Sequence, residues 1–184
     1  MPLFALDPPA STLRPVAARL AAAILSALLL VWASPGAAIA ATPPLSMAVL
    51  DFDYIDTSGE VQDQTSAHQA QLQAMMQSIR GNLVQDGKYR LVPIVCGADP
   101  CSMQRSVPAD LMDATRRAGA RLLLFGGIHK MSTLVQWAKV QVVDVESDKL
   151  VFDRVYTFRG DSAEAWRRAT EYMVKELAAR DFTQ

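Results

Sequence analysis

The run ARLLLFGGIHKM, residues 120–131, constrains the fold more than any other part of the sequence. Its apolar residues follow one another instead of alternating with polar ones, as expected for a central strand that is covered on both faces. Two segments rich in β-branched and aromatic residues come next, STLVQWAKVQVVDV and KLVFDRVYTFR, joined by the polar link ESD. This order predicts an antiparallel hairpin, so that three consecutive strands form the second half of the chain.

The first half of the chain begins with a strand, a helix and a second strand. The apolar run MAVLDFD, residues 47–53, predicts a buried strand, and the polar stretch after it, YIDTSGEVQDQT, predicts a loop. Between residues 66 and 85, apolar side chains recur every three or four positions, which predicts a helix that ends at Gly87. The segment YRLVPIV, residues 89–95, predicts a strand that Pro93 places toward a sheet edge or at a bulge.

Two further helices complete the pattern. Pro108 and Gly119 mark the start and end of one of them. The other begins within GDSAEAW, with Asp161 as N-cap and Glu164 three residues later, the spacing of a capping box. The predicted order is β-α-β-α-β-β-β-α. It indicates the α/β class, with a single mixed β-sheet and flanking helices, and helices on both faces would explain the apolar run.

The N-terminus has the pattern of a secretory signal. Arg14 and Arg19 precede an apolar run at residues 20–33, and an Ala-x-Ala sequence follows at residues 38–40. The run is shorter than the roughly 18 to 20 apolar residues that a membrane span needs, so we expect cleavage, with retention as an anchor as the alternative. The expected organisation is a signal peptide at 1–40, a flexible lead-in at 41–46 and a single α/β domain at 47–181.

The charge of the exported part argues against one class of partner. Removal of Asp7, Arg14 and Arg19 with the signal lowers Lys+Arg from 18 to 16 and Asp+Glu from 19 to 18, so the net charge becomes −2. Such a chain offers no basic surface that could follow a phosphate backbone, and we expect no nucleic-acid partner.

Cys96 and Cys101 are the two cysteines of the sequence. In an oxidising compartment they can close a small disulfide loop over GADP, where Gly97 and Pro100 favour a turn. A redox couple and half of a metal site are the alternatives. Redox couples of the thioredoxin type use a two-residue spacing, and a metal site would need partners nearer than the two histidines. We therefore expect a structural disulfide.

Acidic residues gather at the end of the first predicted strand and in the loop after it. Asp51, Asp53 and Asp56 are candidates for a partner or ligand surface, because ligands of α/β sheets bind at the carboxyl ends of strands. Clustered oxygens also suit Ca²⁺, but the spacing differs from that of an EF-hand loop. We expect neither a metal nor a cofactor, and solvated turn residues are the competing interpretation.

Two other residues are candidates for the same kind of surface. His129 follows the Gly126–Gly127 pair near the end of a strand, and no nucleophile motif is present that could make it a general base. Trp137, in a long predicted strand, is either an exposed aromatic anchor for a partner or a core residue. The remaining histidine, His68, is expected to be exposed on the first turn of its helix.

Two parts of the sequence resemble known families. AVLDFDYIDTSGE together with RGDSAEAWRRATEYMV is similar to a group of secreted proteobacterial proteins classified as a domain of unknown function. More widely, GARLLLFGGI followed by VQVVDVESDKLVFDRVYTFRGDS resembles the amino-terminal domain of the Tol–Pal translocation protein, the periplasmic domain of the curli secretion channel, and lipoprotein activators of peptidoglycan synthases. The resemblance implies a non-catalytic α/β domain that binds another envelope protein.

These observations favour a soluble periplasmic interaction or accessory module without an enzymatic activity, whose partner is another envelope or periplasmic protein. A small-molecule or ion-binding periplasmic protein is the main alternative. A thiol oxidoreductase using Cys96 and Cys101 is a third hypothesis, which the reduction potential of the pair would test. After cleavage of the signal we expect no permanent membrane span.

Overall fold

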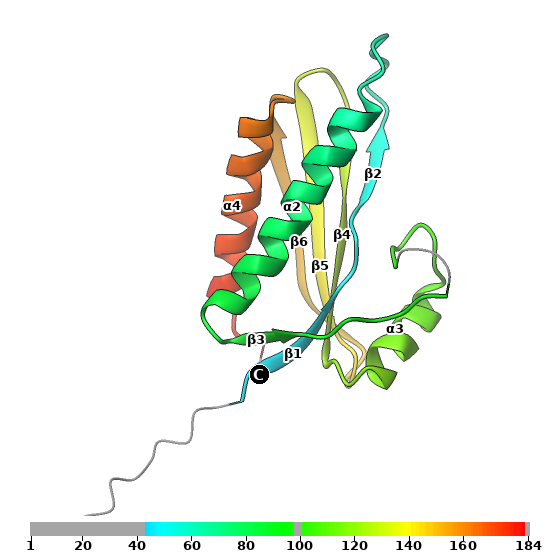
Figure 1. Cartoon of the computed structure of the whole chain (residues 1–184), viewed down its shortest axis with the longest axis vertical. Helices are drawn as coiled ribbons and strands as arrows, with labels where there is room; N and C mark the ends of the chain where they lie inside the picture. Colours follow the sequence, from blue (N-terminus) through cyan, green and yellow to red (C-terminus); the bar gives the residue numbers. More distant parts are fainter. Residues whose placement is uncertain (1–42, 98–100, 183–184) are drawn as a thin grey trace, which may run out of the picture. The chain divides into compact units, whose positions relative to one another are not determined.

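The computed structural model describes residues 43–97 and 101–182; the predicted signal peptide and the start of the predicted lead-in lie outside the described residues. This part of the chain forms six strands and three helices (Figure 1). In chain order they are β1 (Leu45–Val49), β2 (Asp53–Asp56), α2 (Thr65–Gln85), β3 (Tyr89–Leu91), α3 (Pro108–Arg117), β4 (Leu122–Lys130), β5 (Val135–Asp144), β6 (Lys149–Arg159) and α4 (Ala163–Ala179). Within these residues, no helix has the length and hydrophobicity that a membrane span requires.

All six strands belong to one mixed sheet. The strands follow the order β3-β1-β4-β5-β6, and β2 also pairs with β4. β1 is parallel to β3 and β4, whereas β4, β5 and β6 are successively antiparallel. The predicted hairpin is the β5–β6 pair, and the predicted fold class, a single mixed sheet with flanking helices, is confirmed.

Strand β2 is the element that the predicted order lacks. The polar stretch after residue 53 is predicted to be a loop, and for its first residues this prediction is wrong. Met47 of β1 lies opposite Leu122, and Asp53 of β2 opposite Gly127, so six steps along one chain match five along β4. The extra residue lies in the link between β1 and β2, as in a β-bulge. The sequence pattern does not indicate β2, because the exposed Ile55 and Asp56 break the alternation of buried and exposed residues. The strand is defined by its backbone pairing with β4.

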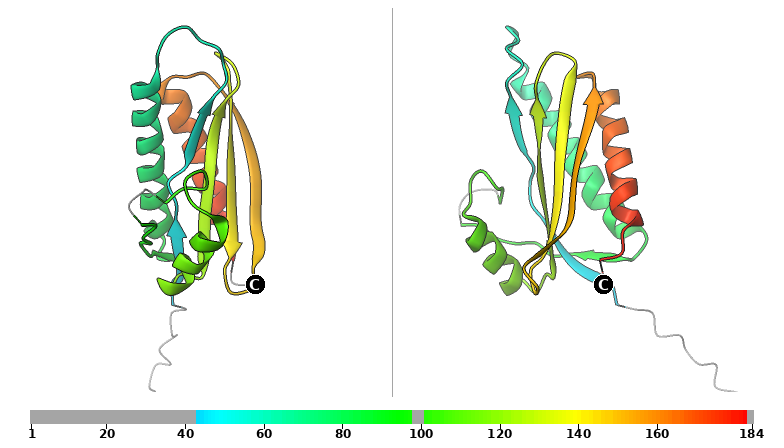
Figure 2. Two further views of the ribbon diagram at one scale, coloured as in Figure 1. Left: turned by 90° about the vertical axis from the view of Figure 1, so that its right-hand side faces the viewer. Right: turned by 180° about the vertical axis from the view of Figure 1, so that it is seen from behind.

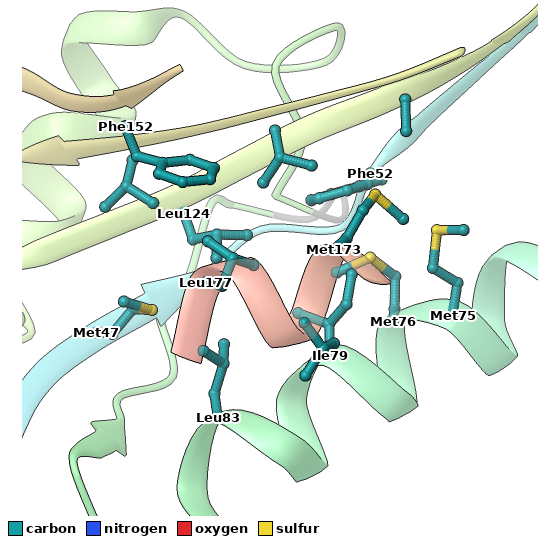
Figure 3. Close-up of a cluster of buried hydrophobic side chains, with 14 of the residues drawn as sticks. Met47, Phe52, Met75, Met76, Ile79, Leu83, Leu124, Phe152, Met173 and Leu177 are labelled. Atoms are coloured by element: carbon teal, nitrogen blue, oxygen red, sulfur yellow. The ribbon is translucent and has the colours of Figure 1, made fainter. Parts of the chain in front are cut away.

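Helices α2 and α4 lie side by side against one face of the sheet (Figures 1 and 2). The apolar stripe predicted for residues 66–85 faces the sheet, with Met75, Met76, Ile79 and Leu83 buried. Figure 3 shows these side chains meeting Met173 and Leu177 of α4 and Leu124 of β4. Full burial of a side chain of this size stabilises the fold by about 1.5 to 3 kcal/mol. Because this cluster holds more buried residues than the cluster on the opposite face, it is the main core.

Helix α3 covers part of the opposite face. Leu111 packs there against Leu123 of β4 and Val145, in a second, smaller cluster. Leu122 and Leu124, on either side of Leu123, belong to the main core. The uninterrupted apolar run of β4 is therefore explained as predicted, because consecutive side chains enter cores on opposite faces.

The cover on this second face stops at one end of the sheet. Seen from behind, β5 and β6 face the viewer with no helix in front of them (Figure 2, right). The burial of β5 alternates strictly along its length, with the residues facing α2 and α4 buried and the others only partly buried. One surface of the sheet is thus open to solvent beyond α3.

The start of α4 differs from the prediction by one residue. Ser162 is the N-cap, and its Oγ accepts a hydrogen bond from the backbone N–H of Ala165 at 3.3 Å. Asp161, the predicted N-cap, instead points into a buried polar cluster described below. Both residues are common at N-caps, and the sequence alone does not separate them.

Candidate functional site

The open face of the sheet carries a shallow depression with a volume of about 230 Å³. It is lined by β2, β4 and β5 and by the chain that follows the cysteine loop. We name it the Trp137 surface, formed by Asp53, Ile55, Phe125, His129, Trp137 and Lys139. Three of the residues predicted from the sequence, Asp53, His129 and Trp137, therefore lie in one place.

The register of three strands places the apolar side chains in one row. Ile55 of β2 lies opposite His129 of β4, which in turn lies opposite Trp137 of β5. The His129 and Trp137 rings meet edge to face, with centroids 5.1 Å apart. A hydrogen bond of 2.7 Å between the His129 Nε2 and the Thr57 Oγ1 fixes the histidine ring. Ile55 is 45% exposed and Trp137 partly buried, so the row is ordered yet accessible.

The glycine pair in β4 allows neighbouring strands to approach closely. A Cβ atom at Gly126 would lie 2.2 Å from the carbonyl oxygen of Lys139, and one at Gly127 would lie 3.1 Å from that of Asp53. No larger residue fits at Gly126 without moving β5. Gly127 also leaves the floor of the Trp137 surface without a side chain, which makes the depression.

The three predicted acids do not form one cluster. Asp51 forms an ion pair with Arg80 of α2 at 2.8 Å. The carboxylate of Asp53 accepts a hydrogen bond from the backbone N–H of Gln104, and that of Asp56 accepts two from Ser58. The pKa of Asp56 is lowered, because the bonds from Ser58 outweigh the opposing effect of burial. In the described ranges no group of three or more His, Cys, Asp or Glu residues could hold a metal ion.

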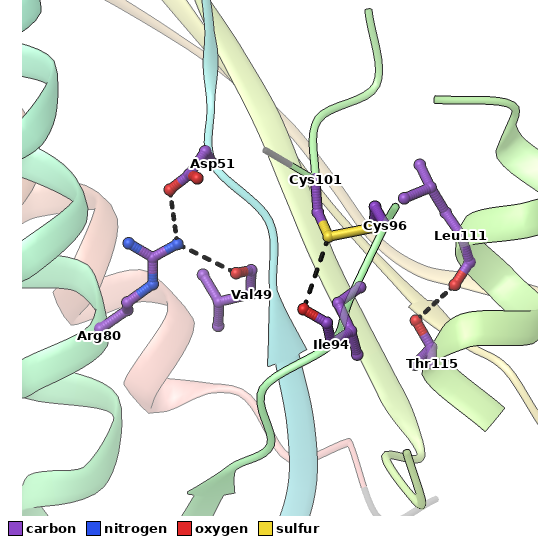
Figure 4. The surroundings of a disulfide bond; sticks show 8 residues. All are labelled: Val49, Asp51, Arg80, Ile94, Cys96, Cys101, Leu111 and Thr115. Carbon is purple, nitrogen blue, oxygen red and sulfur yellow. Dashed lines mark hydrogen bonds and ion pairs between the residues drawn. A yellow bond between two sulfur atoms is a disulfide. The ribbon is translucent and has the colours of Figure 1, made fainter. Parts of the chain in front are cut away.

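The cysteines are joined in a disulfide that lies beside α3 (Figure 4). Cys96 and Cys101 pack against the smaller core cluster. The carbonyl oxygen of Cys101 accepts a hydrogen bond of 3.1 Å from the backbone N–H of Asp51, and its sulfur lies 3.6 Å from the carbonyl oxygen of Ile94. The disulfide thereby fastens the segment after β3 to the link between β1 and β2.

A buried polar cluster lies under the opposite face, and the sequence prediction missed it. Lys130, at the end of β4, has a side chain with no exposed area. Its Nζ donates hydrogen bonds to Asp161 at 2.5 Å, to Gln64 at 2.6 Å and to Glu60. Burial alone would lower the pKa of Lys130, but the two carboxylates outweigh it and raise the pKa. The alternation after Ile128 could have indicated that Lys130 points inward.

His68 belongs to the same cluster. The prediction that it is exposed is wrong: it is 3% exposed, and its Nε2 lies 2.7 Å from the Asp161 carboxylate. Asp161 also accepts hydrogen bonds from Gln136 and Trp166. Burial opposes ionisation of Asp161, but the bonds from Lys130, His68 and Trp166 hold its pKa below the ordinary value. We call Lys130, Glu60, Gln64, His68 and Asp161 the Lys130 cluster.

A polar cleft of about 510 Å³ adjoins this cluster. Asp56, Glu60, Asp63 and Tyr54 are among its lining residues. The Tyr54 hydroxyl is buried and has no hydrogen-bond partner among the described residues. Burial raises the pKa of Tyr54, and the charges of Asp56, Asp161 and Glu60 raise it further.

Comparisons with solved structures find similarities at low sequence identity, among them one that reaches a TM-score of 0.50. The hypothetical protein CT253 from Chlamydia trachomatis is 10% identical, over 73% of this chain and 96% of that one, with a TM-score of 0.50. The LpoB C-terminal domain from Salmonella enterica is 13% identical over 73% and 92%, with a TM-score of 0.45. TolB from Acinetobacter baumannii is 11% identical over 74% of this chain and 28% of that one, also with a TM-score of 0.45.

Sequence comparisons give the family. A search of curated protein sequences finds no match. A family model described as "Protein of unknown function (DUF2380)" matches residues 45–177, which include every strand and almost all of α4. The predicted resemblance to a domain of unknown function is confirmed. The chain belongs to this family.

Proposed function

We propose that the chain is a non-catalytic interaction module of the bacterial envelope, which binds a partner protein through the Trp137 surface. The observation that carries this proposal is the uneven cover of the sheet. One face packs under α2 and α4, while the other is covered by α3 only at one end. An ordered row of Ile55, His129 and Trp137 stays open to solvent there.

The chemistry of the surface suits a protein partner. Tryptophan side chains at the centre of an interface contribute more binding energy than other residues, because a large rigid ring is buried at little entropic cost. The polar neighbours Asp53, Lys139 and Thr57 surround the apolar row and can orient a partner by hydrogen bonds. The predicted export signal and the Cys96–Cys101 disulfide both suit an envelope location.

Site-specific photocrosslinking in cells of the native host tests this function. A photoreactive residue at position 55 is expected to capture a partner protein, and the same residue at Lys175, on the exposed side of α4, is the control. The product from position 55 is expected to disappear in a Trp137→Ser background that keeps the circular dichroism spectrum of the wild type. Equal products from both positions, or none from position 55, would refute the proposal.

A second candidate function is the binding of a small cationic molecule in the cleft beside the Lys130 cluster. The buried, unpartnered hydroxyl of Tyr54 favours it, because a buried polar group without a partner is costly and a ligand could satisfy it. Carboxylates of Asp56, Glu60 and Asp63 line the same cleft. A panel of polyamines and other cationic metabolites should then raise the melting temperature, less so in Tyr54→Phe. No shift with any compound would dismiss this function.

A further inference from the structure

Strand β6 ends the sheet and is the longest strand of the described part of the chain. Within that part, β5 pairs with one edge of β6 and no strand pairs with the other. Beside the open edge runs a groove of about 600 Å³ between β6 and α4. Proteins usually shorten or cover such an edge, because its unpaired backbone groups can pair with another chain.

The hydrogen bonds show which backbone groups point into solvent. The N–H of Gly160 donates to the carbonyl oxygen of Leu134 at 2.9 Å. This bond shows that the even-numbered residues of β6 from Phe152 to Phe158 share the parity of Gly160 in the β5–β6 ladder. In an antiparallel pair, residues of that parity in β6 direct their N–H and C=O groups at β5, and the intervening residues direct theirs away. The outward set is therefore Asp153, Val155, Thr157 and Arg159.

A second contact agrees with this assignment. The carbonyl oxygen of Asp153 accepts a hydrogen bond from the guanidinium group of Arg154 at 3.2 Å, as a carbonyl outside the ladder can. Both Asp153 and Val155 are exposed, and Val155 shows 59% of its surface. The edge is therefore accessible at the middle of the groove.

The side chains around the groove define what could bind there. Tyr156, Phe158, Ala169 and Tyr172 give it an aromatic and apolar wall. Arg154, Arg159 and Arg168 bring positive charge. The one acidic residue of the wall, Glu176, already accepts hydrogen bonds from the hydroxyls of Tyr156 and Tyr172. The groove thus combines an aromatic wall with three basic side chains and one acidic side chain.

We propose that the groove between β6 and α4 binds an extended, acidic segment of another protein, which adds to the sheet as a further strand beside β6. Backbone hydrogen bonds to Val155 and Thr157 would hold the segment. Its alternate side chains would enter the apolar wall, while acidic residues would meet Arg154, Arg159 and Arg168. The same positive charge disfavours pairing with the β6 strand of a second copy, which is itself rich in arginine.

This site is separate from the Trp137 surface and goes beyond the proposed function. The lining residues of the two surfaces do not overlap, so each surface can be substituted and tested by itself. A negative crosslinking result at position 55 would therefore count against the proposed function alone. A negative result for groove binding would count against the present proposal alone.

Hydrogen exchange of the full chain tests the backbone assignment first. The amides of Val155 and Thr157 should exchange rapidly, and those of Tyr156 and Phe158 slowly, because only the latter pair with β5. Slow exchange at Val155 and Thr157 in the free monomer would overturn the proposal.

A library of linear random peptides displayed on phage then tests the occupant. Selection on the full chain should enrich peptides that alternate apolar with acidic residues, and their binding should protect the Val155 amide. Val155→Pro, which removes one outward N–H at an edge where proline is tolerated, should weaken binding by more than about tenfold. Enriched peptides that bind this variant as well as the wild type would overturn the proposal, as would the absence of any enrichment.

Two neighbouring arginines of α4 give a matched control for the charge. Arg168 lines the groove, whereas Arg167 forms ion pairs with Glu164 and Glu171 on the helix surface. Arg168→Gln should weaken binding of the acidic peptides by about two- to fivefold, and Arg167→Gln should leave it unchanged. Equal effects of both substitutions, or sedimentation of the wild type as a dimer through β6, would contradict an acidic peptide as the occupant.

Discussion

Replacement of Lys130 by methionine should destabilise the fold far more than replacement of a lysine on the neighbouring strand. Lys130→Met keeps the length of the buried stem but removes a charge that has no exposed area. Glu60 and Asp161, with side chains 18% and 16% exposed, would then lose their cationic partner. Breaking a buried ion pair from one side costs about 3 to 5 kcal/mol, because the other charge stays desolvated.

The structure places the expected loss at the lower end of this range. Asp161 keeps the hydrogen bonds from His68, Gln136 and Trp166, so only part of its charge is left without compensation. We therefore expect a decrease of about 3 kcal/mol in the free energy of unfolding. For a domain of this size that corresponds to a decrease of about 12 °C in melting temperature.

Lys139→Met is the matched control. Lys139 lies on β5, its side chain is 42% exposed, and its Nζ is 3.9 Å from the carboxylate of Asp153. An exposed pair of this kind contributes about 0.5 kcal/mol or less. Urea unfolding followed by tryptophan fluorescence measures both variants, and an unchanged m-value confirms that they unfold by the same transition. A difference of less than about 1 kcal/mol between the two variants would refute the role given to the Lys130 cluster.

Three other measurements test separate parts of the structure. Gly126→Ala should lower the free energy of unfolding by about 2 kcal/mol or more, because its Cβ would meet a backbone oxygen, whereas Gly81→Ala, in open space on α2, should raise it by about 0.5 to 1 kcal/mol. Reduction of the Cys96–Cys101 disulfide should lower the melting temperature, by an amount equivalent to about 2 kcal/mol for a loop of this size. Because the pKa of Asp161 is lowered on folding, its stabilising effect is complete above its ordinary value of 3.8 and disappears as the pH falls through the folded-state pKa. Asp161→Asn should therefore reduce the loss of stability between pH 5 and pH 2, as measured by urea unfolding at each pH.

The fold was predictable where the pattern of apolar and polar residues indicates which side chains are buried. The uninterrupted apolar run of β4 indicates cover on two faces, and both cores meet at Leu122, Leu123 and Leu124. The stripe on α2 and the hairpin of β5 and β6 follow from spacing and composition alone. β2 was not predictable in this way, because Ile55 and Asp56 are exposed and only its backbone ties it to β4.

The candidate site was predictable only in part, for a related reason. Asp53, His129 and Trp137 have side chains that suit a binding surface, and the register of three strands brings them together. Their neighbours Ile55 and Phe125 are common residues whose position depends on that register, which no local pattern encodes. His68 and Asp161 illustrate the same limit. They are 93 residues apart in sequence, and the local sequence around either residue does not indicate the contact between them.

The Lys130 cluster links the two proposed binding surfaces. His129 and Lys130 are consecutive on β4 and therefore point to opposite faces, so that the residue beside the Trp137 surface is followed directly by the buried charge. Asp161 accepts a hydrogen bond from Lys130 and lies between the end of β6 and the start of α4. These two elements form the groove. A Lys130→Met protein that still folds should consequently exchange amides faster at both sites, at Ile55 and at Tyr156, while α3 and the disulfide remain as protected as in the wild type. If only one of the two sites loosened, the cluster would serve as a local anchor of that site alone.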